Sequence, residues 1–377
     1  MTRRIFVSAG ELSGEHLAAP VVREIRRRAP EVAVDCMGGA HLEAAGARLL
    51  FPLSDLAVLG FQAVFASIGK FVGVIRRFQR YLDDERPDLV LLVDYPGLHV
   101  RFAQLARRAG IPVFYFACPQ LWAWAPWRAK RFAAAVDRAF TILPFEEGYL
   151  RARGIDAKYV GSPALERLEA EARVPPDDML ARMLAGDAPI VALLPGSRPQ
   201  EVDANLPLMI AAATRLAAKR PEVRFVLPQS NEPAARRAES FLRGAPIRVD
   251  LVRRVGPVLA RARAALVASG TATFEVAWHR VPMVVVYRIT RWHRFLGGQF
   301  LTVPWISLVN LVAGAEIVPE FVGPDLDAQA IADACEARLV DGEIRMRCLD
   351  DLDRRFRARL TTGAAAAVAS AALERLA

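Results

Sequence analysis

Lysine and cysteine are scarce in this chain of 377 residues, and long hydrophobic runs are missing. Only four of the 50 basic residues are lysines, so arginine is too common for any single arginine to indicate a function by its identity. The four cysteines show neither the spacing of a metal site nor a paired disulfide framework, which predicts a reducing cytoplasm and no bound metal. No segment has about 18 uninterrupted apolar residues, so we expect no membrane-spanning helix.

Length and charge set the next limits. A chain of 377 residues is too long for one ordinary domain and predicts two. Its net charge of +9 favours acidic partners, which are phosphorylated ligands, anionic lipid headgroups or nucleic acid. The N-terminus has no signal-peptide pattern, because Thr2-Arg3-Arg4 is followed directly by a strand-like run and a glycine turn. We therefore expect a cytoplasmic protein.

The stretch 265–287 has the pattern of half a βαβ unit. An apolar run at Ala265–Ala268 meets a glycine turn, a helical pattern begins near Thr273, and a second apolar run follows at Met283–Val286. Free N–H groups and the helix dipole converge between strand and helix, so the turn predicts an anion site. The residues placed to bind a ligand there are Ser269, Gly270, Thr271, Thr273 and Glu275, the last for a ribose diol. A capped helix whose Glu275 complements the dipole would give the same pattern.

A similar turn follows the first predicted strand, Arg4–Ala9, and leads into an amphipathic helix that ends near Arg28. The turn lacks the GxGxxG spacing of a dinucleotide site, so NAD is not indicated. Two glycines that bracket polar side chains suit the close approach of a polar ligand, and the candidates are Gly10, Glu11, Ser13 and Gly14. A tight first turn of an α/β domain is the alternative explanation.

Asp94 ends a continuously apolar run, Asp88–Asp94, which we expect to be a central strand. A carboxylate in this position lies at the mouth of a parallel sheet, where ligands bind. Alternatively, Asp94 caps the helix predicted over Leu98–Ala109.

Further along, Cys118–Arg128 contains three of the six tryptophans. This loop suits the binding of a sugar face or a lipid interface, unless its rings fill the core.

Arg198, like Asp94, is predicted to lie beyond the carboxyl end of a strand, here in the C-terminal half of the chain. A proline-containing boundary at Val174–Asp178 precedes a strand at Ile190–Leu194, and a loop through Ser197 and Arg198 joins this strand to a helix predicted over Val202–Lys219. An arginine at that point presents a fixed guanidinium to a diphosphate.

The segment 53–80 departs from the alternation of strands and helices. It is long and weakly polar, and it becomes basic at its end. Apolar bulk with a cationic edge is what an interfacial helix needs among acyl chains and anionic headgroups. The residues that would contact a membrane are Phe61, Phe65, Phe71, Arg76 and Arg77. A buried pair of helices beneath a cleft would give the same pattern.

Together these patterns predict an α/β protein with two Rossmann-like, doubly wound parallel-sheet domains that face a cleft. We expect the domains at 1–172 and 173–345, and a helical tail at 346–377 that packs on the N-terminal domain or on a partner chain. The other strands predicted for the two sheets are Val32–Met37, Ile111–Phe116, Thr141–Pro144, Lys158–Gly161, Arg224–Leu227 and Ile247–Leu251.

Six motifs, in order over about Ile5–Phe321, carry a family resemblance. They are Ser8-Ala9-Gly10-Glu11-Leu12-Ser13-Gly14, Asp94-Tyr95-Pro96-Gly97, Pro119-Gln120-Leu121-Trp122-Ala123-Trp124, Leu143-Pro144-Phe145-Glu146, Leu194-Pro195-Gly196-Ser197-Arg198 and Ala268-Ser269-Gly270-Thr271-Ala272-Thr273, with Asn310 beyond them. The chain resembles the bacterial lipid-A-disaccharide synthases, which are inverting glycosyltransferases of the GT-B fold.

The resemblance implies transfer of 2,3-diacylglucosamine from UDP-2,3-diacylglucosamine to 2,3-diacylglucosamine 1-phosphate, which gives the β-1,6 lipid A disaccharide 1-phosphate and UDP. It implies no metal and no other cofactor. The expected partners are the two substrates and the anionic inner face of the cytoplasmic membrane, not nucleic acid. A homodimer through the C-terminal helices is a further expectation.

The resemblance also implies roles for individual residues. Asp94 matches the family's proposed base, Arg198 its diphosphate contact, and Asn310 an asparagine that the family needs for activity. Glu275 matches the usual ribose ligand of GT-B donor sites. An inverting transfer needs a base at the acceptor hydroxyl and positive charge on the leaving diphosphate, which a carboxylate and an arginine beside a helix N-terminus supply.

Four positions depart from the family pattern. Glu15 stands where the family has aspartate, His99 where it has asparagine, Ser162 where it has histidine, and Gly323 where it has glutamine. His99 lies one turn from Asp94 and is placed to orient it or to share its proton. Two other classes stay open. One is an isomerase like the UDP-N-acetylglucosamine 2-epimerases, which share the GT-B architecture but do not contact a lipid. The other is a non-catalytic, membrane-binding or nucleic-acid-binding protein of similar fold.

Overall fold

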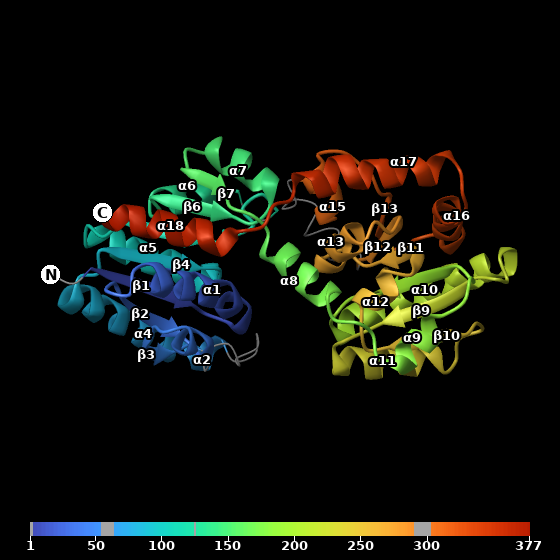
Figure 1. Cartoon of the computed structure of the whole chain (residues 1–377), viewed down its shortest axis with the longest axis horizontal. Coiled ribbons are helices and arrows are strands. Elements are labelled where there is room, and N and C mark those ends of the chain that lie inside the picture. The colour runs from blue at the N-terminus through green and yellow to red at the C-terminus, as the bar shows by residue number, and fades with distance from the viewer. Residues whose placement is uncertain (1–2, 54–63, 124–125, 290–302) are drawn as a thin grey trace. The chain divides into compact units, whose positions relative to one another are not determined.

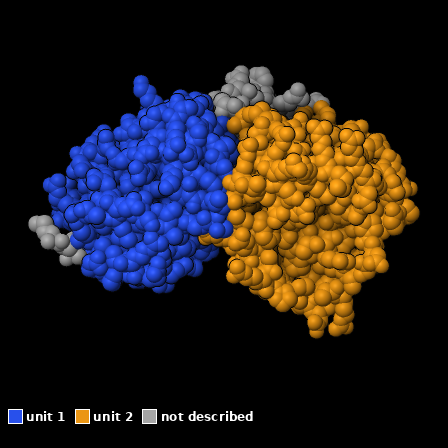
Figure 2. Space-filling view, turned by 45° about the horizontal axis from the view of Figure 1, so that its top comes forward, with its two compact units in different colours: residues 1–163, 361–377 blue, residues 164–360 orange. Residues whose placement is uncertain are grey.

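The computed structural model describes residues 3–53, 64–123, 126–289 and 303–377, with residues 64–68 and 70 described for their backbone alone (Figure 1). The chain forms two compact units (Figure 2). Unit 1 contains residues 1–163 and 361–377, and unit 2 contains residues 164–360. Each unit is built on one parallel sheet with helices between successive strands, which confirms the predicted fold class.

The sheet of unit 1 has the strand order β3-β2-β1-β4-β5-β6-β7. Its strands are β1 (Arg4–Ala9), β2 (Ala33–Gly38), β3 (Arg48–Pro52), β4 (Leu89–Val93), β5 (Val113–Phe116), β6 (Arg138–Thr141) and β7 (Ala157–Tyr159). All five residues of β4 are buried, because a central parallel strand is covered by helices on both faces.

The strand order of unit 1 reverses between β1 and β4. Ala9 pairs with Val93, so the loops that follow these two strands leave the same edge of the sheet side by side. A reversal of this kind is the point where doubly wound sheets bind ligands. The fold therefore brings the Gly10 turn and Asp94 together.

Helices cover both faces of the unit 1 sheet (Figure 1). One face carries α1 (Leu12–Arg28), α2 (Ala40–Ala44) and α18 (Ala364–Leu376). The other carries α4 (Val64–Glu85), α5 (Pro96–Arg108), α6 (Arg128–Ala133) and α7 (Pro144–Arg151). Unit 1 has a hydrophobic core on each face of its sheet. Side chains along β1 alternate between these faces, so Ile5 and Val7 pack against the first helical layer and Phe6 packs against the second.

Only the end of the predicted tail belongs to unit 1. The helix α17 (Glu343–Asp351), the π-helical turn Leu352–Phe356 and the 3₁₀ turn Arg357–Arg359 stay with unit 2, whereas α18 packs against α1. Arg28 Nη1 donates a hydrogen bond to Ser370 Oγ at 2.6 Å, and Ala369 and Ala372 on α18 are fully buried. Small residues let this helix approach α1 closely, so both ends of the chain stabilise the same unit.

The sheet of unit 2 has the order β10-β9-β8-β11-β12-β13. Its strands are β8 (Ile190–Leu194), β9 (Arg224–Pro228), β10 (Val249–Val252), β11 (Ala262–Val267), β12 (Met283–Arg288) and β13 (Glu320–Gly323). The order reverses between β8 and β11, where Leu194 pairs with Val267. The loops after Leu194 and Val267 therefore form the second point suited to a ligand.

The helices of unit 2 include the long α10, whose buried face packs on β8 and β11 together with α11 and α16. Their bounds are α8 (Pro163–Ala172), α9 (Asp178–Leu184), α10 (Pro199–Lys219), α11 (Glu232–Leu242), α12 (Gly256–Leu259), α13 (Thr271–Trp278), α15 (Leu308–Ala313) and α16 (Ala328–Leu339). The helices α10 and α13 begin after the two loops of the switch point, so both N-termini lie at this edge of the sheet.

Candidate active site

Gly10 is fixed by the ring of Tyr95 at the switch point of unit 1. A Cβ atom at position 10 would lie 2.1 Å from Cδ1 of Tyr95, so only glycine fits beneath the ring. The turn after β1 and the corner after β4 are thus packed against each other. Glu11 and Ser13 are exposed beside them, where a ligand has access.

Gly14 and Glu15 serve the packing of this region. Gly14 is buried, and a Cβ atom there would lie 3.4 Å from the carbonyl oxygen of Val93. It therefore lets α1 approach β4, and it does not offer a ligand the close approach expected from the sequence. Glu15 is 4% exposed and accepts a hydrogen bond from the backbone N–H of His41 at 3.2 Å. Its carboxylate leaves no room for a side chain at Gly39.

Asp94 stands at the carboxyl end of β4 in a left-handed backbone conformation. Its φ is 52°, and that of Tyr95 is 51°. Each such non-glycine residue costs about 1–3 kcal/mol, and strain of this kind persists where the surrounding structure enforces it. The side chain of Asp94 is half-buried. Burial raises the pKa of its carboxyl group, and a hydrogen bond from the Tyr95 backbone opposes that rise. A carboxylate in this state is suited to accept a proton.

His99 contacts the main chain of Asp94 and not its carboxylate. The ring Nδ1 lies 2.6 Å from the Asp94 carbonyl oxygen, and Nε2 lies 2.9 Å from Ser8 Oγ. His99 is fully buried, and burial lowers its pKa to about 4. The expectation that His99 shares a proton with the Asp94 side chain is therefore wrong, since the ring is neutral and both nitrogens are engaged elsewhere.

In unit 2, two buried amides hold the loop that follows β8. Asn205 Nδ2 donates to the carbonyl of Pro195 at 3.0 Å, and Gln229 Nε2 donates to that of Gly196 at 2.7 Å. Both side chains are 5% exposed or less. These bonds hold the two carbonyls, and the next two N–H groups, of Ser197 and Arg198, lie at the N-terminus of α10.

Glu201 occupies that N-terminus. Its Oε2 accepts hydrogen bonds from the N–H groups of Ser197 and Arg198 at 2.8 and 3.2 Å. Its Oε1 lies 3.0 Å from Nη1 of Arg198, whose side chain is 75% exposed. A carboxylate thus stands where two N–H groups and a guanidinium converge, and this is the set of donors that binds a phosphate.

The second loop of unit 2 contains the helix start at Gly270, which has a φ of +142°. Helix α13 begins at Thr271, two residues earlier than predicted. Thr271 is exposed in the first turn, whereas Thr273 is fully buried and donates its hydroxyl proton to the carbonyl of Gly270 at 2.8 Å. Thr273 therefore does not fit the expected role of a phosphate donor. Ser269 Oγ likewise donates to the carbonyl of Ile306, at 2.8 Å.

Glu275 is half-buried on α13, and burial raises the pKa of its carboxyl group. The charge of Arg167 on α8 opposes this rise and lowers that pKa. A half-buried carboxylate one turn inside the helix can accept hydrogen bonds from a diol that approaches the exposed N-terminus.

A family model described as lipid-A-disaccharide synthetase matches residues 5–374. The chain belongs to this family. A lipid-A-disaccharide synthase of Myxococcus xanthus is 37% identical over 379 residues, which cover 99% of this chain and 97% of the relative.

Solved structures agree with the fold of this chain. The UDP-GlcNAc 2-epimerase of Neisseria meningitidis has a TM-score of 0.61 at 16% identity, with coverage of 99% of this chain and 100% of the other. The calicheamicin glycosyltransferase CalG4 has a TM-score of 0.58 at 18% identity, with coverage of 100% and 99%. At such identities the likeness concerns the fold alone, so the epimerase neighbour does not support an isomerase.

Asn310, which the family resemblance marks as necessary, lies in a closed network. The side chain is fully buried. Its Nδ2 donates to the carbonyl of Val318 and to Glu320, both at 2.8 Å, and its Oδ1 accepts from the N–H groups of Ile317 and Val318. No hydrogen-bonding capacity is left for a substrate, so this geometry does not fit the catalytic role expected for the Asn310 side chain.

The tryptophan loop is partly core. Trp122 is 5% exposed, and its Nε1 donates to Glu146 Oε1 at 2.9 Å. Burial raises the pKa of Glu146 to about 7. Trp127 is 64% exposed, and Trp124 lies outside the described residues. The alternative of core filling is thus correct for Trp122 and incorrect for Trp127.

The predicted membrane residues fall into three groups. Phe61 lies outside the described residues, as does the side chain of Phe65. Phe71 is partly buried against the core of unit 1. Arg76 and Arg77 are exposed on α4, and the guanidinium of Arg77 lies 4.4 Å from the ring centroid of Phe51. Of the helices in the described ranges, none is long and apolar enough to cross a bilayer.

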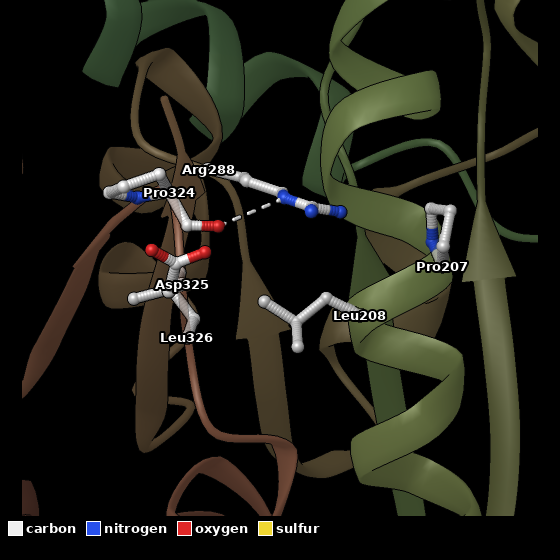
Figure 3. Close-up of a pocket in the computed structure, with 6 residues that line it drawn as sticks. All are labelled: Pro207, Leu208, Arg288, Pro324, Asp325 and Leu326. Atoms are coloured by element: carbon white, nitrogen blue, oxygen red, sulfur yellow. Dashed lines mark hydrogen bonds between the residues drawn. The ribbon is translucent and has the colours of Figure 1, made fainter. Parts of the chain in front are cut away.

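Two of the family departures lie away from the switch points. Ser162 is buried where the tail re-enters unit 1, and its N–H donates to the carbonyl of Thr361 at 2.8 Å. Gly323 ends β13 at the rim of unit 2. Beside it, a cavity of about 380 Å³ opens among Pro207, Leu208, Arg288, Pro324, Asp325 and Leu326. In Figure 3, Nε of Arg288 donates a hydrogen bond to the carbonyl of Pro324, and the end of the guanidinium group points toward α10.

Several residues that shape the site were missed by sequence reasoning. They are Tyr115, Glu201, Asn205 and Gln229. Glu201 had a signal, since a glutamate three residues after a helix start indicates a capping box. The other three act on main-chain carbonyls far away in sequence, which no local pattern reveals. Among the described residues, no group of three or more histidine, cysteine, aspartate or glutamate side chains is placed to hold a metal.

Proposed function

We propose that this member of the family transfers 2,3-diacylglucosamine from UDP-2,3-diacylglucosamine to 2,3-diacylglucosamine 1-phosphate with inversion, giving the β-1,6 lipid A disaccharide 1-phosphate and UDP. The observation that carries the proposal is the family match over residues 5–374. The chemistry of the two switch points supports it, because unit 1 offers a half-buried carboxylate and unit 2 a set of phosphate donors.

Asp94 is assigned the role of general base. It removes the proton from the acceptor hydroxyl as the oxygen attacks the anomeric carbon of the donor. The raised pKa of its carboxyl group strengthens it as a proton acceptor, and the enforced backbone at β4 keeps its position constant. The exposed Glu11 and Ser13 beside it are assigned to the binding of a polar part of the substrate.

Arg198 and the N-terminus of α10 are assigned to the diphosphate. As the bond to the sugar breaks, negative charge grows on the β-phosphate, and a guanidinium with two N–H groups stabilises it. In this structure these donors are bound to Glu201. We infer that the diphosphate replaces the Glu201 carboxylate there. Gly270 and Thr271 at the start of α13 would contact the nucleotide, with Glu275 on the ribose.

Asn310 is assigned a positioning role. Its amide joins α15 to the segment before β13 through Ile317, Val318 and Glu320. Ser269 is bonded to Ile306, and Glu320 accepts hydrogen bonds from the N–H groups of Ile306 and Ser307. Asn310 thereby acts on the loop of Ser269 and Gly270 through neighbouring residues and not by contact with the substrate.

Acylated substrates support a reaction at a membrane surface. We propose that the protein works at the inner face of the cytoplasmic membrane, with α4 and the preceding segment as the contact. The exposed Arg76 and Arg77 and the net charge of +9 suit anionic headgroups. A homodimer through the C-terminal helices stays a prediction, which the molecular mass in solution tests.

The experiment that tests the function is UDP release by the purified protein from UDP-2,3-diacylglucosamine. We expect release only when 2,3-diacylglucosamine 1-phosphate is present, together with a disaccharide product. Equal release without the acceptor would contradict the transfer. Conversion of UDP-N-acetylglucosamine to its 2-epimer, with no disaccharide formed, would support the isomerase instead.

A further inference from the structure

Two side chains from different elements converge on one main-chain oxygen, that of Asp94. His99 Nδ1 on α5 and the hydroxyl of Tyr115 on β5 each lie 2.6 Å from this carbonyl oxygen. Both side chains are fully buried. Both lone pairs of the oxygen are therefore used by groups that the core holds in place.

The proton positions in this arrangement follow from the chemistry of the partners. A carbonyl oxygen only accepts, so Nδ1 of His99 carries a proton. The ring is neutral in its buried position, and Nε2 consequently accepts the hydroxyl proton of Ser8, 2.9 Å away at the end of β1. The order of donation runs from Ser8 to His99 to the Asp94 carbonyl, and Tyr115 donates to the same oxygen from the other strand.

The held oxygen belongs to the first of two consecutive left-handed residues, Asp94 and Tyr95. Such a pair would relax in a free peptide because its Cβ atoms crowd the backbone. Tyr95 in turn covers Gly10. The two donors therefore fix the direction of the Asp94 peptide, and with it the direction in which the Asp94 carboxylate leaves the sheet.

We propose that His99 and Tyr115 are positioning residues that hold the Asp94 carbonyl and so keep the Asp94 carboxylate aimed at the acceptor hydroxyl. This proposal rests on the proposed function, in which Asp94 is the base. Neither residue touches substrate, and neither exchanges a proton in the reaction.

The test uses two replacements of His99 that separate its two contacts. The Nδ2 of asparagine takes the place of Nδ1 of histidine, so His99→Asn keeps the donor to Asp94 and loses the contact with Ser8. The terminal amide of glutamine takes the place of Nε2, so His99→Gln keeps the contact with Ser8 and loses the donor. Ser8→Ala is a control that removes the outer contact alone.

We expect His99→Asn and Ser8→Ala to retain kcat within about threefold. We expect His99→Gln to lower kcat about 10- to 100-fold, because a shift on the order of 1 Å at the base is enough for such a loss. The KM values of both substrates should change by less than about twofold, since neither His99 nor Tyr115 touches a substrate. Wild-type kcat in His99→Gln, or an equal loss in the two His99 variants, would overturn the proposal.

Tyr115→Phe keeps the test decisive if His99 variants do not fold. It removes only the hydroxyl group, and we expect kcat to fall about threefold to tenfold with an unchanged thermal unfolding temperature within a few degrees. An unchanged kcat in this variant would overturn the role of Tyr115.

A readout that does not depend on the reaction separates this proposal from the role of Asp94 as base. In crystal structures, the left-handed pair at 94–95 should persist in His99→Asn and relax in His99→Gln. Persistence in both variants would overturn the positioning role whatever the kinetics. Relaxation in His99→Gln together with a fully active Asp94→Asn would support positioning and refute the base.

Discussion

At the scale of the residue, the site is marked by backbone conformation more than by side-chain identity. Of the five left-handed non-glycine residues in the described ranges, Asp94, Tyr95 and Ala117 follow central strands of the unit 1 sheet at its carboxyl edge, with φ values of 52°, 51° and 56°. The other two, Arg86 and Arg280, lie elsewhere. Strained residues gather where function requires a fixed geometry. The sequence could not predict this, because glycine or asparagine usually marks such positions and none stands there.

The first residue-scale prediction concerns Asp94. Asp94→Asn is nearly isosteric, so the protein should fold normally and bind UDP as before, while kcat falls about 100-fold or more because the base is gone. A base must be deprotonated, so wild-type activity should fall as the pH drops through the pKa of Asp94, which burial places above its ordinary value of 3.8. Steady-state kinetics and UDP binding at several pH values measure both effects.

The same experiment has a clear contrary result. An Asp94→Asn enzyme with near-normal kcat would remove Asp94 from catalysis, and the acid limb of the wild-type profile would then belong to another group. His99 is not that group if its ring stays neutral down to about pH 4.

The second residue-scale prediction concerns Arg198. Arg198→Ala should lose roughly 3–4 kcal/mol of leaving-group stabilisation, a fall in kcat on the order of 100- to 1000-fold. Lysine should restore only part of the rate, because a point charge cannot reproduce the planar fork of guanidinium. Near-normal turnover of the alanine variant would exclude Arg198 from the site.

Glu201→Gln is the matched variant for Arg198. It keeps an oxygen for the N–H groups of Ser197 and Arg198 but carries no charge. We expect turnover to be retained and UDP to bind more tightly, because no carboxylate then competes for the guanidinium. Weaker binding of UDP, measured by calorimetry, would show that the Glu201 carboxylate supports the site and does not compete with the diphosphate.

At the scale of the element, the sequence located the strands that end at the site. Arg4–Ala9 and Ile190–Leu194 have the predicted bounds. Both are short apolar runs that stop at glycine or proline turns, and such boundaries are local signals. The strand predicted at Thr141–Pro144 instead spans Arg138–Thr141 as β6, because Pro144 begins α7.

Two edge strands were missed for a physical reason. β3 (Arg48–Pro52) and β13 (Glu320–Gly323) are only partly buried and contain arginine, proline, glutamate or glycine. An edge strand has a neighbour on one side only and needs no continuous apolar run. Their existence follows from pairing with β2 and β12, which is a tertiary fact.

The element-scale prediction concerns Glu146, which ties α7 to the tryptophan loop. The carboxyl group is 2% exposed, and its pKa rises from the ordinary value of 4.5 to about 7 because burial disfavours the charge. Between these values the folded chain binds a proton that the unfolded chain does not. Stability should therefore fall as the pH rises from about 4.5 to about 7 and then stay level, by about 3 kcal/mol in all.

Glu146→Gln cannot ionise and supplies the control. The free energy of unfolding in urea should decline from pH 5 to pH 8 by about 2–3 kcal/mol more in the wild type than in the variant. Parallel pH dependences of the two proteins would mean that the Glu146 carboxyl is not perturbed in the folded state.

At the scale of the whole molecule, the order of motifs along the chain was sufficient for the family and the fold. Each motif lies where a strand ends, so the sequence alone marks the carboxyl edges of both sheets. The division into units was less accessible. The tail predicted from residue 346 divides at Leu360, since Phe356 packs against Phe274 of unit 2 with ring centroids 5.1 Å apart, whereas α18 returns to α1.

The roles inside the site followed from sequence only in part. Asp94 directly follows β4, and Arg198 lies in the loop between β8 and α10, as expected, because the pattern of a strand fixes where it ends. Asn310 was expected from the family resemblance and Thr273 from its place after a glycine turn. The structure uses the polar atoms of Thr273 on the main chain, and those of Asn310 on the main chain and on Glu320. Sequence shows which residues are polar and near an edge, and it does not show whether a hydrogen bond is still free.

The whole-molecule prediction concerns the membrane. Val72 is 38% exposed on α4, whereas its neighbour Phe71 is partly buried in the core. Val72→Asp should therefore leave the fold intact and weaken sedimentation with anionic vesicles, and Phe61→Asp and Phe65→Asp should do the same if those residues are interfacial. Phe71→Asp should instead destabilise the protein. Aggregation of Phe61→Asp and Phe65→Asp would indicate that the segment is core.

Charge reversal supplies the electrostatic half of that prediction. Replacing Arg76 and Arg77 with glutamate should weaken vesicle binding and make the remainder less sensitive to salt, because attraction between exposed charges is what salt screens. Arg23→Glu with Arg27→Glu on α1 gives the same change in net charge on the helical layer that covers the opposite face of the sheet. This control pair should bind vesicles nearly as the wild type does. Equal losses in the two pairs would mean that net charge alone draws the protein to the membrane, and α4 would not be the contact.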